Sequence, residues 1–219
     1  MGKTDNELAW LWAVNENLWL LDKHDGYLIH RVKNRKFNVE DLELFFKNYS
    51  LLRWLPKFAH EKKWMQHIID VCDKVYSEPL PKSGYWGLAK ERWFKVMDKL
   101  KKRSGGEKTL WSASMKLYWL YQPDKLPMYD TYVRNSLAKI AIENGYIKTK
   151  SGLIGENFLD VFSRFYQASL PEIKLAIKTV PRKYPYPTRV AEKYLWLLGA
   201  EDMNDRIRNF EASLIIAPL

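Results

Sequence analysis

Residues 100–130 read LKKRSGGEKTLWSASMKLYWLYQPDKLPMYD and contain the clearest helix boundaries of the chain. A basic helix end meets a tight Ser-Gly-Gly turn at Ser104, and a strongly aromatic helical segment follows and is ended by Pro123. A Pro-led turn from Pro127 then delivers Asp130 to the start of another helix. The stretch therefore predicts consecutive helices joined by short turns.

Helical patterns also cover most of the remaining chain, and no long alternation of Val, Ile or Thr indicates a strand. We therefore predict a mainly α protein. The expected helices are Glu7–Leu21, Val39–Asn48, Pro56–Tyr76, Leu88–Leu100, Thr109–Tyr121, Tyr129–Asn144, Asn157–Gln167, Pro171–Thr179, Arg189–Leu198 and Asp202–Ser213.

Local signals mark several ends of these helices. Asn38 and Thr188 are the expected N-caps of the helices that follow them. Asp25-Gly26 is expected to end the first helix, and Gly145 the helix from Tyr129. Residues 148–155 are predicted to form a polar loop, with a small hairpin as the alternative.

A chain of 219 residues is long enough for a sizeable core. We expect residues 1–219 to form one compact unit, or two lobes of about residues 1–80 plus the C-terminal helices and about residues 84–147. No apolar window reaches the roughly 18 residues of a membrane span, and the N-terminus lacks a secretion signal. The single cysteine, Cys72, reads as a buried thiol. We expect a cytoplasmic monomer without a membrane partner.

The charge balance favours a polyanionic partner. Lys and Arg total 36 against 26 Asp and Glu, a net charge of +10, although a merely basic soluble protein is the alternative. Ten Trp and 13 Tyr are interleaved with these charges, as in Lys63-Trp64 and Lys116-Leu117-Tyr118-Trp119. Aromatic rings stack on unpaired bases, so the mixture suits a protein that handles exposed bases, while most of the rings must still fill the core.

Several catalytic motifs are absent from the sequence: the P-loop, GxGxxG, His-Glu-x-x-His, CxxC and GxSxG. The four histidines are spread along the chain without acidic or cysteine neighbours at ligand spacing. We expect no metal and no cofactor.

Residues 100–130 contain two features that could serve a function, a turn that can bind phosphate and a carboxylate at the start of a helix. Backbone N–H groups at the turn before the aromatic helix can bind a phosphate, at Gly105, Gly106, Lys108 and Thr109. A carboxylate at the start of a helix, as at Asp130, is held in place and kept ionised by the N–H groups that it caps.

This arrangement resembles the helix-hairpin-helix DNA glycosylases, the superfamily of endonuclease III and the 8-oxoguanine glycosylases. In that family a glycine-rich hairpin clamps the DNA backbone, and an invariant aspartate follows at the start of a helix. Gly105 to Thr109 is similar to a degenerate hairpin, and Pro127-Met128-Tyr129-Asp130 to the aspartate turn. The resemblance covers about Leu100–Leu137 and implies a two-lobed, glycosylase-like helical fold whose lobes flank a DNA-binding cleft.

The chain departs from the family pattern at two points. Its hairpin has neither the Leu-Pro lead nor the second glycine two places on. Strand-cutting members carry a lysine somewhat under 20 residues before the aspartate, whereas Trp111 lies 19 residues before Asp130 here. The resemblance therefore implies a base-only, monofunctional enzyme that leaves an abasic site, in DNA repair or in phage defence. Bulky glucosylated hydroxymethylcytosine of phage DNA is one substrate that it suggests.

Base excision passes through an oxocarbenium-like sugar after the nucleotide is flipped into an aromatic pocket. Asp130 is the expected carboxylate that stabilises this charge, and Lys116 is the second catalytic candidate. The candidates for binding the flipped base are Trp111, Tyr118, Tyr129, Trp86 and Tyr85, the last two from a glycine-flanked loop. The candidates for binding phosphates are Lys101, Lys102, Arg103, Lys108 and Arg134, with the turn at Gly105, Gly106 and Thr109.

Each role has a structural alternative. Asp130 can serve only as an N-cap, and Lys116 as a solvated helix residue or a phosphate contact. Trp111 and Trp119 can belong to the core, and the cations of residues 99–103 can simply favour the helix dipole. Two rival functions also stay open, a non-catalytic nucleic-acid-binding protein and a protein-interaction module.

Overall fold

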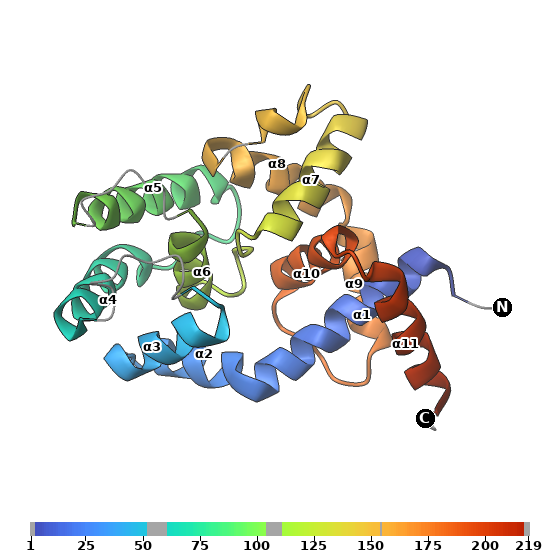
Figure 1. Ribbon diagram of the computed structural model, residues 1–219, viewed down its shortest axis with the longest axis horizontal. Helices are drawn as coiled ribbons and strands as arrows, with labels where there is room; N and C mark the ends of the chain where they lie inside the picture. The colour runs from blue at the N-terminus through green and yellow to red at the C-terminus, as the bar shows by residue number, and fades with distance from the viewer. Residues whose placement is uncertain (1–2, 52–60, 104–110, 154, 217–219) are drawn as a thin grey trace. The chain divides into compact units, whose positions relative to one another are not determined.

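The computed structural model describes residues 3–51, 61–103, 111–153 and 155–216 (Figure 1). Every element assigned in these ranges is helical, so the mainly α prediction is confirmed. The α-helices are α1 (Asp5–Leu20), α2 (Gly26–Lys33), α3 (Val39–Asn48), α4 (Lys62–Tyr76), α5 (Trp86–Arg103), α6 (Trp111–Tyr121), α7 (Thr131–Glu143), α8 (Gly155–Ala168), α9 (Leu170–Thr179), α10 (Pro187–Gly199) and α11 (Met203–Ile216).

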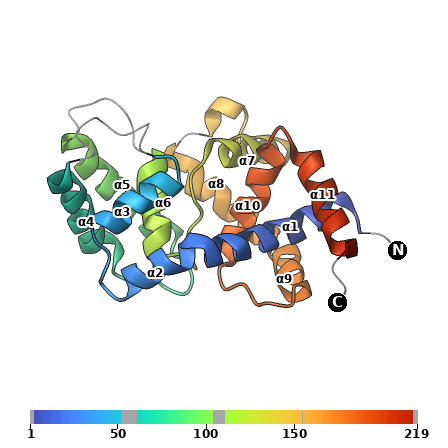
Figure 2. The same ribbon diagram turned by 60° about the horizontal axis from the view of Figure 1, so that its bottom comes forward.

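The chain divides into two compact units. Unit 1 contains residues 1–20 and 129–219, and unit 2 is the continuous segment 21–128. These boundaries differ from the expected ones near residues 80 and 147. The difference arises because α1 packs against α9, α10 and α11, and α7 packs against α10, so both helices belong with the C-terminal part of the chain (Figures 1 and 2).

The core of unit 1 is built from aromatic rings and one close approach of two helices. Trp10 of α1 stacks on Tyr194 of α10, with ring centroids 3.7 Å apart. At the end of α10, a Cβ added to Gly199 would lie 2.6 Å from the backbone oxygen of Tyr132 in α7. Glycine at this position therefore lets α7 and α10 pack backbone against backbone.

The core of unit 2 joins α4, α5 and α6. The rings of Tyr76 and Tyr118 stack in parallel at 3.9 Å, and both side chains are fully buried. The indole N–H of Trp93 in α5 donates to the hydroxyl of Ser114 in α6 at 2.8 Å. Cys72 is also buried here, in agreement with the structural reading of its thiol.

The expected break at Asp25-Gly26 is wrong. Residues Leu21–Asp25 form a π-helical turn, and the chain continues directly into α2, which the sequence analysis missed. The Asp25 carboxylate is buried and accepts a hydrogen bond from the Tyr49 hydroxyl at 2.7 Å. A Cβ on Gly26 would lie 2.6 Å from the Leu21 carbonyl oxygen, so this glycine allows the π turn to close rather than ending the helix.

Of the other predicted boundaries, some agree with the structure and some do not. Helix α3 begins and ends as predicted, with Asn38 and Asp41 forming a reciprocal capping box. Thr188 is not an N-cap, because α10 begins at Pro187 after Tyr186 and the Thr188 side chain is buried. Residues Lys150–Gly152 form a short 3-10 turn where a loop or hairpin was expected. The predicted starts at Pro56 and Thr109 lie outside the described residues.

Among the described helices, none combines the length and the apolar character needed to span a membrane.

Candidate functional site

Asp130 is the N-cap of α7, as the sequence predicts. Its backbone is extended, and a side-chain oxygen accepts a hydrogen bond from the backbone N–H of Tyr132 at 3.0 Å. The side chain is half-buried, so the cap contact does not remove it from solvent. This hydrogen bond fixes the position of the carboxylate at the N-terminus of α7.

Two other predicted site residues lie close to Asp130 in the chain, Arg134 in the first turns of α7 and Tyr129 directly before Asp130. Arg134 is half-buried one turn further on, and its backbone N–H closes the first helical hydrogen bond to the Asp130 carbonyl at 2.9 Å. Tyr129 is buried, and its ring meets Phe158 edge to face at 4.8 Å. Tyr129 therefore packs in the core of unit 1, and this contact orients the turn that carries Asp130.

The sequence analysis missed an aromatic and cationic cluster that begins two residues after Asp130. The Tyr132 ring is 40 % exposed and meets the Trp196 ring edge to face at 5.5 Å. Two cations lie over Trp196, the Lys193 ammonium at 4.8 Å and the Arg206 guanidinium at 5.1 Å from the ring centroid. A hydrogen bond to Asp202 raises the pKa of Arg206 above its ordinary value. These residues come from three separate helices, and spacing along the sequence gave no sign of them.

Lys116 is buried in unit 2, which contradicts its reading as a solvated helix residue. Its ammonium lies 5.7 Å from the ring centroid of Tyr49, a cation–π contact. The Tyr49 hydroxyl in turn donates to the buried Asp25, to which His24 Nδ1 also lies close at 2.5 Å. Lys116 thus joins a buried group of charged and aromatic side chains around the π turn.

Tyr118 and Trp111 have packing roles in α6. The Tyr118 ring is fully buried against Tyr76, and burial raises the pKa of its hydroxyl above the ordinary range. Trp111, at the first residue of α6, is half-buried and meets Trp93 and Phe94 edge to face at 5.0 and 5.5 Å. Trp119 is 1 % exposed and belongs to the core, as its structural alternative has it.

Tyr85 and Trp86 lie where α5 begins, rather than in a loop before it. Gly84 has a positive φ of 65° and turns the chain into the helix, whose first residue is Trp86. Tyr85 is buried, and its hydroxyl donates to the Lys125 carbonyl at 3.1 Å. Trp86 is half-buried with its ring 4.7 Å from that of Tyr85. Of this pair, Trp86 keeps the greater exposure.

Most of the residues predicted to bind phosphate lie outside the described residues. This applies to Gly105, Gly106, Lys108 and Thr109 as a whole, and to the side chains of Lys101, Lys102 and Arg103. The backbone of residues 101–103 is the last turn of α5. These assignments therefore stay predictions.

The net positive charge is concentrated in one unit. Residues 21–128 contain 22 Lys and Arg against 13 Asp and Glu, a net charge of +9. Unit 1 contains 14 against 13. The candidate carboxylate and most of the excess positive charge thus belong to different units.

Comparison of the chain with protein-family models, with curated proteins and with solved structures gave no significant match.

Asp130 is a fixed, partly exposed carboxylate, suited to stabilising a developing positive charge or to orienting a water molecule. In the described parts of the chain, no group of three His, Cys, Asp or Glu side chains comes together as a metal site would require. Tyr129 and Arg134 accompany Asp130 in unit 1, while Lys116, Tyr118, Trp111, Tyr85 and Trp86 belong to unit 2.

Proposed function

We propose that this protein is a monofunctional DNA glycosylase that excises a modified or damaged base and leaves an abasic site. The observation that carries the proposal is the Asp130 carboxylate, fixed at the N-terminus of α7 by the Tyr132 N–H and still partly exposed. The net charge of +9 in residues 21–128 supports a polyanionic substrate.

The mechanism assigned to Asp130 is electrostatic. Departure of the base leaves positive charge on the sugar, and a carboxylate beside the anomeric carbon stabilises it. The same carboxylate orients the water that attacks this carbon and accepts its proton. Because the helix dipole and the cap hydrogen bond already hold the charge in place, little reorganisation is needed as the transition state forms.

Two features support base excision without strand cleavage. Trp111 lies 19 residues before Asp130, where strand-cutting members of the resembled superfamily carry a lysine, and an indole cannot form a Schiff base. Lys116, the second catalytic candidate, is buried and contacts the Tyr49 ring. Asp130 is accordingly the one catalytic residue in the proposal.

The decisive variant is Asp130→Asn. Asparagine caps helices as well as aspartate does, so the fold is retained while the negative charge is lost. Purified protein is incubated with duplexes that carry damaged bases or modified cytosines, including glucosylated hydroxymethylcytosine, and free base and alkali-labile sites are measured. We expect the variant to lower excision by at least about 100-fold, the usual loss when a group that stabilises transition-state charge is removed.

Asp205→Asn is the matched control. Asp205 lies in the first turn of α11 in the same unit, and it pairs with the exposed Arg208 at 2.6 Å, outside the Trp196 cluster. Its loss should leave excision unchanged. The proposal is wrong if no substrate releases a base, or if Asp130→Asn retains the activity of the parent.

A non-catalytic nucleic-acid-binding protein is the second candidate, favoured by the concentration of charge in unit 2. It predicts salt-dependent binding without any base release. In that case Asp130→Asn leaves the affinity unchanged or raises it, because a charge that repels phosphate is removed.

A further inference from the structure

The C-terminal end of α2 presents a basic surface that no sequence motif singled out. Between His30 and Lys36 the chain contains Arg31, Lys33, Arg35 and Lys36, and no acidic residue. Lys33, Arg35 and Lys36 are exposed. We call Lys33, Arg35 and Lys36 the α2 end.

Hydrogen bonds fix the backbone of the α2 end. The N–H of Lys36 donates to the Arg31 carbonyl at 2.9 Å, and the N–H of Arg35 donates to the Val32 carbonyl at 3.0 Å. This pair of bonds is the Schellman motif that ends many helices, and it places Arg35 at the position with left-handed backbone. The φ of Arg35 is 53°.

Left-handed backbone is unfavourable for arginine, because its Cβ crowds the following carbonyl oxygen. Glycine is the usual residue at this position, and the same chain uses it at the end of α7, where Gly145 has a φ of 69°. The end of α3 has the same motif with Ser50 at a φ of 52°, where the N–H of Leu51 donates to the Phe46 carbonyl at 2.8 Å. An exposed arginine in this conformation is therefore a local cost in stability with no packing gain.

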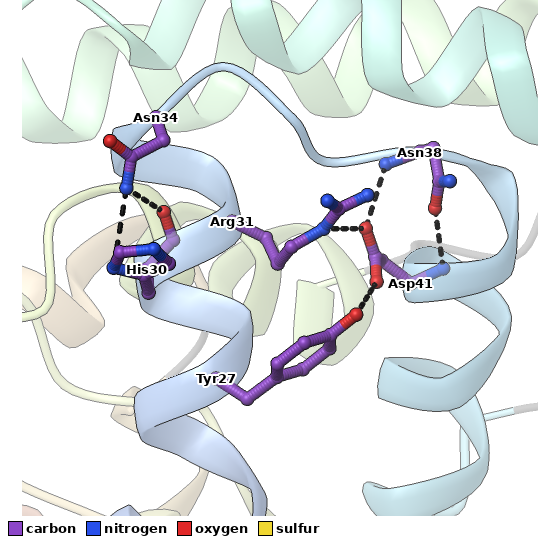
Figure 3. Close-up of polar contacts among 6 residues, drawn as sticks. All are labelled: Tyr27, His30, Arg31, Asn34, Asn38 and Asp41. Carbon is purple, nitrogen blue, oxygen red and sulfur yellow. Dashed lines mark hydrogen bonds and ion pairs between the residues drawn. The ribbon is translucent and has the colours of Figure 1, made fainter.

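Side chains of the last two turns of α2 contact the start of α3, as Figure 3 shows. Asp41 at the start of α3 accepts hydrogen bonds from Arg31 Nε at 2.8 Å and from the Tyr27 hydroxyl at 3.0 Å. The Asn34 side chain donates to the His30 carbonyl at 2.8 Å, which caps the last turn of α2. Arg31 is thus committed to Asp41 and is not counted in the α2 end.

The acidic side chains of α3 are Glu40, Asp41 and Glu43. Asp41 is buried and already accepts hydrogen bonds, while Glu40 and Glu43 of α3 are exposed. Glu40 lies 4.0 Å from the Lys62 ammonium, at the start of α4. Residues 33–36 themselves contain three cations and no acidic residue.

We propose that the α2 end binds the phosphate backbone of the DNA substrate, with Arg35 as its principal contact. The proposal rests on the proposed function and adds a DNA-binding site at residues 33–36. A guanidinium suits phosphate because it donates hydrogen bonds in a planar fork. The Schellman turn and the Asp41 contacts hold the backbone that carries Arg35 in one conformation. Binding therefore costs little conformational entropy of the backbone.

The test uses Arg35→Gly, with Ser50→Gly as the matched control. Both substitutions place glycine at the left-handed residue of a Schellman motif in the same unit, and only the first removes a charge. Each should raise the melting temperature by about 2–4 °C, because strain is relieved at one residue. Binding to a fluorescent 20-base-pair duplex is measured by anisotropy at several salt concentrations.

Arg35→Gly should weaken binding about eightfold at 0.1 M salt. It should also make the negative slope of log K against log salt shallower by about 0.9. Both are the values for one lost phosphate contact. Ser50→Gly should leave both quantities unchanged. Arg35→Lys, which keeps the charge, should retain most of the affinity. A variant that is stabilised and weakened in binding at once is not expected of a residue with only a structural role.

Three results would overturn the proposal. In the first, the parent binds the duplex and Arg35→Gly binds it with the same affinity and salt slope, which leaves the proposed function standing. In the second, Arg35→Gly fails to raise the melting temperature, which refutes the strained conformation. In the third, Arg35→Gly weakens binding to phosphatidylserine vesicles and not to DNA, which assigns the surface to a membrane. Absence of any duplex binding by the parent refutes the proposed function itself.

Discussion

Gly199→Ala should destabilise the protein, even though alanine is the better helix former. The substitution in a helix is ordinarily worth about 0.5–1 kcal/mol in favour of alanine. Here the new Cβ would lie 2.6 Å from the Tyr132 carbonyl oxygen and 2.7 Å from the Ser136 hydroxyl. The hydroxyl can rotate away, but the carbonyl belongs to the backbone of α7 and cannot.

The size of the effect follows from that geometry. Restoring an ordinary contact of 3.4 Å requires α7 and α10 to separate locally by about 0.8 Å. Overpacking of this kind costs about 1–3 kcal/mol, which exceeds the propensity gain and leaves a net loss of about 1–2 kcal/mol. Because the Tyr132 N–H holds the Asp130 carboxylate, the same shift should also lower base excision.

Gly87→Ala is the control for this prediction. Gly87 lies in α5, and a Cβ added to it meets nothing within 4 Å. Its substitution should stabilise the protein by up to about 1 kcal/mol. The free energy of unfolding is measured by urea denaturation with circular dichroism as the signal. If Gly199→Ala is as stable as Gly87→Ala, the close packing of α7 on α10 is not as described.

Two further predictions concern buried charge and buried phenols. Glu192→Gln should lower the free energy of unfolding by about 3–5 kcal/mol because it leaves the buried Arg189 without its ion pair, whereas Arg189→Met with Glu192→Leu should restore most of the loss in urea denaturation. Stability should fall as the pH rises above about 10, because burial raises the pKa of Tyr76 and of Tyr121, so that the unfolded chain releases protons that the folded protein retains. Part of the tyrosinate absorbance should then appear only with unfolding, and a rise that is complete before unfolding would contradict the buried positions of these two hydroxyls.

The sequence predicts helix positions well where capping chemistry is local. The Asn38 capping box, the Asp130 cap and the glycine end of α7 all depend on residues within four positions of one another. The failure at Asp25-Gly26 has a tertiary cause. There the Asp25 carboxylate is satisfied by Tyr49, 24 residues away, and this contact outweighs the ordinary tendency of the pair to end a helix.

The candidate site is predictable only in part, for the same reason. Asp130 follows from its turn, but the Trp196 cluster unites residues of α7, α10 and α11 that no spacing connects. Aromatic residues were hard to assign from sequence because a stacking ring and a core ring have the same pattern. The sequence predicts Tyr118 and Tyr129 as residues that bind the flipped base, but both are buried. Tyr132, which is 40 % exposed, matches no pattern of a binding residue.

The division of the chain into units has a consequence for synthesis on the ribosome. Unit 2 is one continuous segment, so all of its packing partners are present once residue 128 has emerged. Helix α1 is made first but packs on α10, and Asn17 donates to the Arg189 carbonyl 172 residues later. Until α10 is made, the rings of Trp10 and Trp12 lack their native partners, so we expect α1 to expose apolar surface during synthesis.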